Sequence, residues 1–358
     1  MGVNKKIAIL CNYELLPERV GGMDYFFWQF DAKCKQNNIE VHWFFPNRSE
    51  HGEYGNLTIF DSNNQNVESF FLDFCFQNNP SYTHVITHFV ELCTPFFYKI
   101  KRFSNAKVIA VDHNPRPLNG YSVKKKIEKR LKGILFSRYI DLFVGVSQYT
   151  VNALVYDFGN HLQHKIKTIY NGVIIDDIKV RPQRNYTNPT FLVTSHLRES
   201  KGIQDLIEAV ARLPVAIKSK LVIDIYGDGP YKAFLLNKIR DKQLEVNFIF
   251  KGSVSNLKEL YCQYDYMLQP THMECFSLSI LESLAANVPV ITTNVGGNEE
   301  VITNNKNGFI TAAKDISALQ HVIKKVYLGD FKSTQNTRAL IETRFSLDSM
   351  VDNYLKLI

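Results

Sequence analysis

The sequence lacks the long apolar segments and the paired cysteines of membrane-spanning or disulfide-rich proteins. No window of about 18 consecutive apolar residues occurs among its 358 residues, so it predicts no membrane-spanning helix. The six cysteines are widely spaced and include no Cys-x-x-Cys pair, which argues against a zinc knuckle, a redox motif or a disulfide framework. This cysteine usage fits a reducing, cytoplasmic environment.

A strong excess of charge of one sign is also missing. The net charge of +7, from 42 basic and 35 acidic residues, permits anionic small molecules or a membrane surface but requires no nucleic acid. Hydrophobic residues make up 45% and charged residues 22%, which excludes a disordered chain. The first residues run into a short apolar segment without a small-residue cleavage site, so we expect a strand there rather than a signal peptide.

The pattern that is present is an alternation of short β-branched or aromatic runs with segments of helical period, which is typical of doubly wound parallel α/β sheets. In the first half this predicts strands at 5–11, 39–45, 83–87, 107–112, 141–146 and 166–170, and helices at 22–37, 66–78, 94–103, 122–138 and 147–157. The polar segment 176–190 predicts a linker. The alternation then restarts, with strands at 191–195, 220–226, 246–250, 265–269, 289–293 and 308–311, helices at 202–213, 230–242, 255–262, 278–286 and 315–328, and a helical tail at about 331–358.

Helix 202–213 shows the periodicity on which these predictions rest. Its apolar residues recur at helical spacing and predict one buried stripe; they are Ile203, Leu206, Ile207, Val210 and Leu213. We therefore expect two Rossmann-like doubly wound domains facing a central cleft. Such sheets bind ligands beyond the carboxyl ends of their strands, and clefts between domains are common ligand sites.

Two glycines, Gly21 and Gly22, stand between the first strand and the first helix. Glycine at a helix N-terminus lets an anion approach the exposed amides, so the pair fits a phosphate cradle. A plain tight turn fits it equally well. The full Gly-x-Gly-x-x-Gly fingerprint is absent, which counts against a dehydrogenase.

In the second half, His196, Arg198 and Lys201 follow strand 191–195. Cations at that strand end can neutralise a diphosphate and stabilise it as a leaving group. Ordinary loop solvation is the alternative interpretation.

Two carboxylates flank the start of helix 278–286. Glu274 lies in the loop after strand 265–269, and Glu282 lies within the helix. The free amides of a helix N-terminus can hold phosphate, and a carboxylate, which only accepts hydrogen bonds, suits the vicinal hydroxyls of a sugar. Most glutamates are solvated surface residues, but Glu282 stands among apolar neighbours at a strand's carboxyl end.

Several short motifs occur in one order along the chain. They are Val146-Ser147, Asn171-Gly172-Val173, Arg198-x-x-Lys201-Gly202, Gly227-Asp228-Gly229-Pro230, Phe250-Lys251-Gly252, Gln269-Pro270-Thr271, Glu274-x7-Glu282 and Pro289-Val290-Ile291-Thr292-Thr293-x-x-Gly296-Gly297. Their order and spacing resemble the family 4 retaining glycosyltransferases of the GT-B fold. The resemblance covers nearly the whole chain and is strongest over 191–311.

The resemblance implies a domain division and a role for each matching residue. It implies an N-terminal acceptor-side domain at 1–176, a C-terminal nucleotide-sugar domain at 177–335, and a terminal helix at 336–358 that packs back on the first domain. It assigns catalytic roles to Glu274, Lys201 and His113, the last being the active-site histidine near the sugar. The implied donor-binding residues are Gly22, His196, Arg198, Lys201, Gly252, Val254, Glu274, Phe276, Ser277, Leu278 and Glu282.

Within that set, the resemblance implies that Glu274 bonds hydroxyls of the donor sugar and that Glu282 binds the ribose. Lys201 and the Gly22 amide would contact the diphosphate. The amides of 276–278 would hold sugar hydroxyls and phosphate oxygens, and the main chain of 251–254 would line the base.

The chain departs from the family at one position. Where the family usually has Gly-Arg-Leu, this sequence has Ser195-His196-Leu197. A histidine is neutral in roughly half or more of the molecules at pH 7, so it grips a diphosphate less firmly than an arginine does. Either Arg198 or His196 replaces the missing arginine, and the sequence leaves both open.

Segment 122–138 is a basic amphipathic helix. Its basic residues are Lys124, Lys125, Lys126, Lys129, Arg130, Lys132 and Arg138, and its apolar face consists of Ile127, Leu131, Ile134 and Leu135. We expect the apolar face to pack inward, as such faces usually do. The basic rim is a candidate contact with an anionic membrane surface, which residues of 98–103 would extend. Loop residues His88, Glu91, Asn114 and Arg116 are candidate acceptor contacts.

Together these features predict a cytoplasmic retaining hexosyltransferase, peripheral at the inner face of the cell membrane. The donor would be a nucleoside-diphosphate sugar, with a UDP-sugar favoured, and the acceptor a glycan or a lipid-linked sugar in cell-surface polysaccharide or lipopolysaccharide synthesis. No cofactor and no metal are expected, since the nucleotide sugar is a substrate and no Asp-x-Asp motif lies in a suitable loop. The alternatives are a nucleotide-sugar epimerase on the same fold and a non-catalytic sugar-nucleotide-binding subunit.

Overall fold

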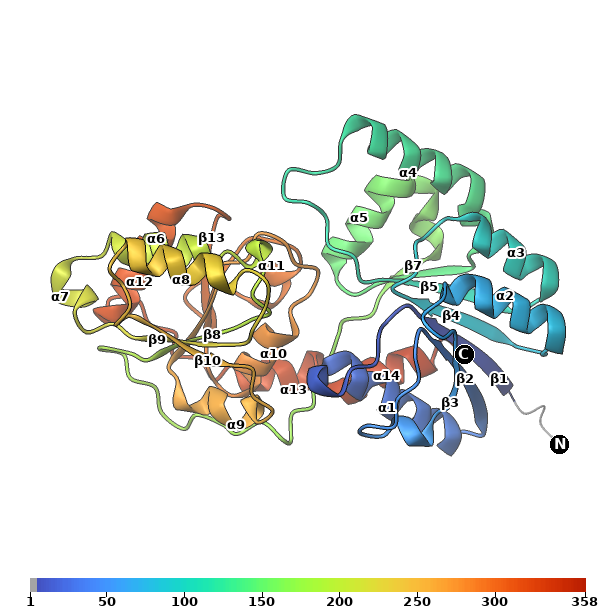
Figure 1. Ribbon diagram of the computed structural model, residues 1–358, viewed down its shortest axis with the longest axis horizontal. Coiled ribbons are helices and arrows are strands. Elements are labelled where there is room, and N and C mark those ends of the chain that lie inside the picture. The colour runs from blue at the N-terminus through green and yellow to red at the C-terminus, as the bar shows by residue number, and fades with distance from the viewer. Residues whose placement is uncertain (1–4) are drawn as a thin grey trace. The chain divides into compact units, whose positions relative to one another are not determined.

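The computed structural model describes residues 5–358, and Figure 1 shows them as two compact units. Unit 1 runs to Pro115 and includes Asn119–Asn171 and Leu347–Ile358. Unit 2 consists of Arg116–Leu118 and Gly172–Ser346. Each unit is a parallel sheet covered by helices, so the prediction of two doubly wound α/β sheets is confirmed.

Unit 1 contains a seven-stranded parallel sheet in the order β3-β2-β1-β4-β5-β6-β7. Its strands are β1 (Lys5–Cys11), β2 (Ile39–Phe45), β3 (Thr58–Asp61), β4 (His84–His88), β5 (Lys107–Asp112), β6 (Leu142–Gly145) and β7 (Ile166–Thr168). Its helices are α1 (Gly22–Gln36), α2 (Val67–Asn78), α3 (Pro95–Phe103), α4 (Val123–Phe136), α5 (Gln148–Phe158) and α14 (Leu347–Leu355). Strand β3 was not predicted, because only four residues of that segment are extended.

The last helix, α14, packs on α1 within unit 1. The ring of Tyr354 lies 4.9 Å from that of Phe26, and the Lys33 ammonium lies 2.9 Å from the Asp352 carboxylate. Tyr354 and Val351 are fully buried. The final residues of the chain therefore complete a layer over a sheet whose first strand begins at Lys5.

Unit 2 contains a six-stranded parallel sheet in the order β10-β9-β8-β11-β12-β13. Its strands are β8 (Phe191–Thr194), β9 (Ile223–Tyr226), β10 (Phe248–Gly252), β11 (Tyr266–Gln269), β12 (Val290–Thr293) and β13 (Gly308–Thr311). Its helices are α6 (Ile203–Ala211), α7 (Val215–Lys218), α8 (Lys232–Asp241), α9 (Leu257–Leu260), α10 (Leu278–Ala285), α11 (Asn298–Val301), α12 (Ile316–Tyr327) and α13 (Arg338–Arg344). The short helices α7 and α11 were not predicted, because four residues are too few to show a helical period.

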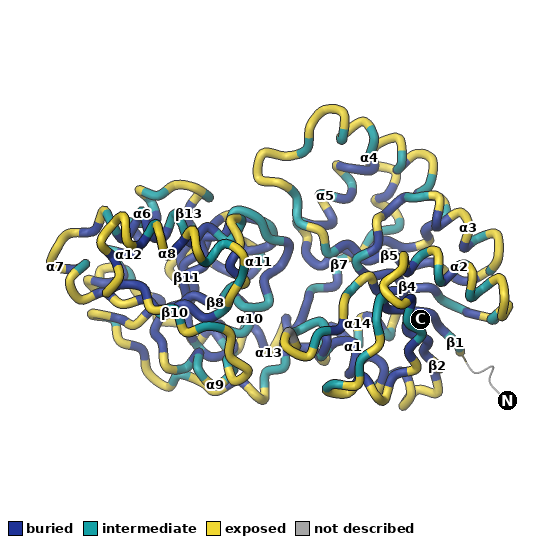
Figure 2. Tube along the Cα trace, viewed as in Figure 1, coloured by how far each residue is buried: buried dark blue, intermediate teal, exposed yellow. Residues whose placement is uncertain are grey.

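The predicted stripe of α6 is confirmed. Ile203, Leu206, Ile207 and Val210 are buried in the core of unit 2, and Leu213 just beyond the helix joins them. In Figure 2 the central strands of both sheets are buried, whereas α4 in unit 1 is largely exposed.

The expectation that the apolar face of α4 packs inward is wrong. Ile127, Leu131, Ile134 and Leu135 are each more than half exposed. The helix instead meets α5 through Gly133, where an added Cβ would lie 2.1 Å from the carbonyl oxygen of Phe158. Because so close an approach admits only a glycine, this contact sets the inward face, and the larger apolar side chains point outward.

Candidate functional site

The predicted site residues of unit 2 lie at the carboxyl ends of its strands. The first strand of the unit, β8, lies between β9 and β11, so the chain order reverses beside it. In doubly wound sheets ligands bind beyond the strand ends at such a reversal. The segments that leave β8 and β11 there carry Lys201 and Glu274.

Gly202 lets the turn after β8 approach the segment after β11. Its φ of +70° is favourable for glycine, and an added Cβ would lie 1.8 Å from the carbonyl oxygen of Pro270. The amide of His272 donates to the carbonyl oxygen of Ser200 at 2.7 Å, and the Thr271 hydroxyl donates to the same oxygen. These contacts fix the backbone of the residues around Lys201.

Lys201 and Glu274 form an ion pair at this strand reversal. The Lys201 Nζ lies 2.8 Å from Oε2 of Glu274, while Oε1 accepts a hydrogen bond from the Cys275 amide at 3.2 Å. Both side chains are mostly but not fully buried, at 23% and 18% exposure. A cation and an acceptor thus stand together where a ligand can still reach them. The sequence indicated both residues but not their contact.

The backbone of the loop that carries Glu274 packs against Gly296 and Gly297. A Cβ on Gly296, whose φ is +63°, would lie 2.1 Å from the carbonyl oxygen of Glu274. The Gly297 amide donates to the carbonyl oxygen of Cys275 at 2.8 Å. The Gly-Gly motif is therefore explained by the close packing of two backbones.

Ser277 caps helix α10. Its hydroxyl accepts from the amide of Ile280, and the side-chain amide of Gln269 donates to it at 2.9 Å. The positive end of the helix dipole thus lies directly after Phe276 and Ser277 and favours negative charge there. Phe276 is buried and packs its ring 5.4 Å from that of Phe345. Leu278, the first residue of α10, is only partly buried.

Glu282, inside α10, is held by a tyrosine that sequence reasoning missed. The hydroxyl of Tyr261 donates to Oε2 of Glu282 at 3.0 Å, and that hydroxyl also lies 3.1 Å from the Thr194 hydroxyl at the end of β8. Burial raises the pKa of Glu282. The carboxylate is a positioned acceptor rather than a solvated surface group. No sequence signal links Tyr261 to it, since the two come from different elements.

Two glycines of the Gly227-Asp228-Gly229 motif pack against the segment after β8. A Cβ added to Gly227 would lie 2.0 Å from the carbonyl oxygen of Ser195. A Cβ added to Gly229 would lie 2.4 Å from the carbonyl oxygen of Leu197. The Gly227 amide also donates to the carbonyl oxygen of Gly252 at 2.8 Å. The ends of β8, β9 and β10 are therefore linked by backbone contacts.

These contacts place the remaining candidates of unit 2. His196 and Arg198 are exposed on either side of buried Leu197. Gly252 has a φ of +72°, and no atom lies within 4 Å of an added Cβ. Val254 is 36% exposed. The main chain around Gly252 is thus accessible, as a main-chain contact with a base would require.

In unit 1, Gly22 begins α1, and the glycine loop before it is held by Asp24. The buried carboxylate of Asp24 accepts from the Gly21 amide at 2.8 Å and from the hydroxyls of Tyr13 and Tyr54. The first helical hydrogen bonds run from the Asp24 and Tyr25 amides to the Gly21 carbonyl oxygen, so the Gly22 amide precedes them. Sequence reasoning missed Asp24, although an acidic residue three positions after a helix cap is a recognised signal.

His113 follows β5 and is paired with His88, the last residue of β4. Nε2 of His113 lies 3.0 Å from Nδ1 of His88, and Phe89 stacks on the His113 ring at 4.2 Å with a φ of +58°. Burial lowers the pKa of His113 to about 3 and also lowers that of His88, where His113 adds to the effect. Both imidazoles are neutral at pH 7.

The other candidates of unit 1 lie as follows. His88 is 1% exposed, so it supports His113 and is not presented to a ligand. Glu91 is exposed and lies 2.7 Å from the Lys132 ammonium of α4. The Asn114 side chain donates to the Asp112 carboxylate at 3.2 Å. Across residues 5–358, no group of three or more His, Cys, Asp or Glu side chains could hold a metal ion.

The chain is similar to known proteins in sequence and in fold. Residues 175–342 match the family model described as glycosyl transferases group 1. The N-acetyl-alpha-D-glucosaminyl L-malate synthase of Bacillus anthracis is 26% identical over 57% of this chain and 61% of its own length. An uncharacterized 41.2 kDa protein in the cps region of Klebsiella pneumoniae is 26% identical over 65% of each chain. The chain thus spans less than two thirds of these curated relatives.

Among solved structures, Anabaena HepE in complex with UDP superimposes with a TM-score of 0.75. The match covers 98% of this chain and 99% of that one at 18% sequence identity, so it concerns the fold. The match over residues 175–342 confirms the resemblance to the glycosyl transferases of group 1, and the chain has the GT-B fold of its structural neighbours.

Proposed function

We propose that the protein transfers a sugar, with retention, from a nucleoside-diphosphate sugar to an acceptor hydroxyl. The observation that carries this proposal is the ion pair of Lys201 and Glu274 at the strand reversal of unit 2. A cation beside an acceptor carboxylate suits a donor that has a diphosphate at one end and hydroxyls at the other. A UDP-sugar is the favoured donor, in keeping with the UDP complex of the Anabaena neighbour.

In this mechanism Lys201 donates from Nζ to a diphosphate oxygen, and Glu274 accepts from a sugar hydroxyl. The start of α10 adds backbone amides and the positive end of its dipole, and Glu282 accepts from the ribose. The acceptor hydroxyl attacks the anomeric carbon on the face from which the diphosphate leaves, and a diphosphate oxygen takes the proton. Lys201 and the helix then stabilise the negative charge that develops on the leaving group.

The groups that we propose for unit 1 bind through hydrogen bonds and carry no charge at pH 7. The Gly22 amide donates to the diphosphate. Neutral His113 hydrogen-bonds the sugar or the acceptor, because its lowered pKa of about 3 excludes a cationic role at pH 7. His196 and Arg198 are both exposed, and we propose that they share the diphosphate contact.

A donor screen tests the proposal. UDP-, GDP- and ADP-sugars at millimolar concentration are added to the protein, and both the melting temperature and the released nucleotide are measured. A bound donor raises the melting temperature by mass action. A donor concentration of about 100 times Kd raises the free energy of unfolding by about 2.7 kcal/mol. If no sugar nucleotide raises it, the proposal fails.

The chain provides a matched control for the Lys201–Glu274 pair. Lys238 and Glu208 of unit 2 form an ion pair of similar exposure, 22% and 21% against 23% and 18%. Lys201→Met and Glu274→Gln are expected to abolish the donor-induced shift, while Lys238→Met and Glu208→Gln retain it. Equal losses in both pairs would mean that the effect is only one of stability.

The same assay separates the alternatives. An epimerase converts the sugar nucleotide without an acceptor and releases no nucleotide, whereas a non-catalytic subunit binds the donor but turns nothing over. We favour transfer, because the ion pair provides a cation that can stabilise a diphosphate as it leaves. The acceptor that we propose is a glycan or lipid-linked sugar of cell-surface polysaccharide or lipopolysaccharide synthesis, a setting that the Klebsiella relative's cps region supports. Incubation of labelled donor with membrane lipid extract, followed by chromatography of the lipid phase, tests that acceptor.

A further inference from the structure

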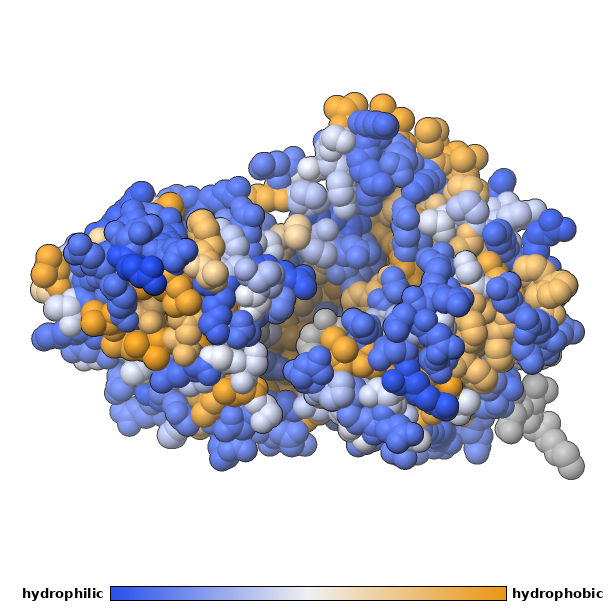
Figure 3. Space-filling model, viewed as in Figure 1, coloured by the Kyte–Doolittle hydropathy of each residue, from blue (hydrophilic) through white to orange (hydrophobic). Residues whose placement is uncertain are grey.

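The outward side of α4 in unit 1 carries a row of apolar side chains that donor chemistry does not explain. Val123 is 72% exposed, Ile127 56%, Leu131 54%, Ile134 61% and Leu135 51%. These are the largest contributors to an apolar surface that spans the whole length of the helix. Figure 3 shows hydrophobic atoms beside strongly hydrophilic ones along the rim of unit 1 that Figure 1 labels α4.

The orientation of this row is fixed by the packing of α4. Gly133 is buried against the backbone of Phe158, so the helix cannot rotate without losing that close contact. At about 100° per residue, positions 123, 127, 131, 134 and 135 span an arc of roughly 120° on the side opposite Gly133. The apolar residues thus form a continuous stripe that faces away from the sheet.

Cations border the stripe. By the same helical geometry Lys124 lies inside the arc, close to one of its edges, and Arg130 lies just beyond the opposite edge. Both residues are exposed. Segment 122–138 contains seven basic residues and one acidic residue, Glu128. That carboxylate pairs with Lys125 and Lys132. The positive charge at the edges of the stripe therefore stays uncompensated by the helix itself.

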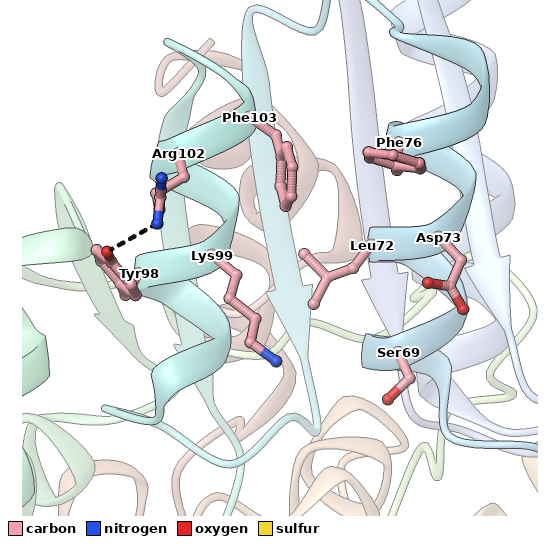
Figure 4. Close-up of a pocket in the computed structure, with 8 residues that line it drawn as sticks. All are labelled: Ser69, Leu72, Asp73, Phe76, Tyr98, Lys99, Arg102 and Phe103. Carbon is pink, nitrogen blue, oxygen red and sulfur yellow. Dashed lines mark hydrogen bonds between the residues drawn. The ribbon is translucent and has the colours of Figure 1, made fainter.

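The neighbouring helix α3 continues this surface. The ring of Tyr98 lies 5.1 Å from that of Tyr139, which follows α4. Between α2 and α3 lies an open groove of about 650 Å³, with Phe76 and Phe103 facing each other at one end, as Figure 4 shows. Phe76 is 75% exposed and Phe103 is 49% exposed. Arg102 also lines the groove, and its side chain donates to the Tyr98 hydroxyl at 3.4 Å.

We propose that this α3–α4 surface, formed by the α4 stripe with Lys124 and Arg130 and by Tyr98, Arg102, Phe103 and Phe76, docks on a lipid bilayer that contains anionic lipids. An exposed aliphatic stripe bordered by Lys and Arg, with aromatic residues nearby, is the composition of a helix that lies in the membrane interface. Its apolar side chains enter the headgroup–acyl boundary while the cations contact anionic headgroups. A second copy of the chain is a poorer occupant, because two such surfaces would bring like charges together.

This proposal goes beyond glycosyl transfer and does not require it. It gives a lipid-linked acceptor a surface on which to meet the enzyme. Its failure and that of the proposed function are distinguishable, because donor binding is measured on unit 2 residues without lipid.

Co-sedimentation of the full chain with vesicles tests the proposal. Vesicles of phosphatidylcholine alone are compared with vesicles of phosphatidylcholine and phosphatidylglycerol. The protein is expected to sediment with the anionic vesicles only, and less at about 0.5 M salt, where screening shortens the range of the charges to roughly 4 Å. Absence of binding to anionic vesicles overturns the proposal.

Two sets of variants separate the apolar and the charged contributions. Ile127→Gln with Leu131→Gln is expected to lower the partition coefficient at least tenfold, and Lys124→Glu with Arg130→Glu about 25-fold or more. The controls are Val215→Gln with Val246→Gln in unit 2, which are 76% and 72% exposed in the parent, and Lys220→Glu with Lys306→Glu. These controls are expected to bind vesicles as the parent does.

The outcomes are exclusive. Equal vesicle binding by the α4 variants and the parent, at an unchanged melting temperature, refutes the role of the stripe. A dimer of the parent in sedimentation velocity that the stripe variants lose identifies a second copy as the occupant and also overturns the proposal. A circular dichroism spectrum and a melting temperature equal to those of the parent show that the variants are folded.

Discussion

The two sheets of the molecule both reverse their strand order beside their first strand, but they present opposite chemistry there. In unit 2 the reversal holds a cation and a carboxylate, Lys201 and Glu274, kept 2.8 Å apart at partial exposure. In unit 1 the strand next to β1 across the reversal, β4, ends at His88, whose neighbour His113 is neutral because burial lowers its pKa. The same architecture thus provides charge in one unit and uncharged hydrogen bonding in the other.

This difference indicates a division of labour. An anionic leaving group needs charge stabilisation, whereas a sugar or acceptor hydroxyl needs directional hydrogen bonds without a competing cation. This division would be wrong if variants of the His88–His113 pair weakened the binding of free UDP as strongly as variants of the Lys201–Glu274 pair do.

The largest effect is expected at Lys201. Lys201→Met should lower turnover about 10²–10³-fold, because it removes the cation that we propose faces the leaving group. Release of UDP from the donor measures this, with Lys238→Met as the control. A reduction of less than about threefold would remove Lys201 from the mechanism and with it the charged half of the comparison.

A pair of glycines in unit 2 gives the next largest effect. Gly202 and Gly252 have nearly the same φ, +70° and +72°, but an added Cβ at Gly202 meets the Pro270 carbonyl oxygen at 1.8 Å while one at Gly252 meets nothing. Gly252→Ala is expected to cost about 1–2 kcal/mol from backbone conformation alone, and Gly202→Ala about 3 kcal/mol or more. Thermal melts measure both. Equal costs would show that the Lys201 turn does not depend on close packing.

The neutral pair of unit 1 predicts a pH dependence of stability. Because the folded pKa values of His88 and His113 lie below the unfolded value of about 6.5, the unfolded chain binds more protons below that pH. The free energy of unfolding should therefore be highest above pH 7 and fall on acidification, by at most about 1.4 kcal/mol per pH unit for each histidine. Urea unfolding between pH 7 and pH 4 measures this, with His113→Gln expected to flatten the slope. An unchanged slope in that variant would mean that His113 is charged in the folded protein.

The smallest effect is expected at His196. His196→Arg places a permanent cation beside Arg198 and should tighten UDP binding about fivefold, since a charge-assisted hydrogen bond contributes about 1 kcal/mol more than a neutral one. Calorimetric titration of UDP measures it. Unchanged affinity would show that Arg198 already fills this role.

The two amphipathic helices α4 and α6 show what sequence reasoning can and cannot predict. The period of each correctly grouped its apolar residues on one face, and Ile203, Leu206 and Val210 of α6 are buried as expected. In α4 the same reasoning failed, because a period tells which residues share a face but not which way that face points. The missed signal was Gly133, whose lack of a side chain permits close contact on the opposite side.

The candidate site could also be predicted only in part from the sequence. Ordered motifs indicated Lys201, Glu274 and Glu282 as candidates, because their positions relative to strand ends can be read along the chain. Tyr261 was not found in this way, and His88 was predicted as an acceptor contact rather than as the support of His113. Each of them supports a residue of a different element, and only the fold brings the partners together.

The packing of α14 on α1 has a consequence for synthesis on the ribosome. Unit 1 contains the first half of the sequence, yet one of its layers, with Tyr354 and Val351, is translated only after unit 2. At typical translation rates the intervening residues 172–346 take roughly 10–35 s to emerge. For that interval the aromatic face of α1 around Phe26 is without its cover, so a nascent chain of this protein is a natural client for chaperones that shield apolar surface.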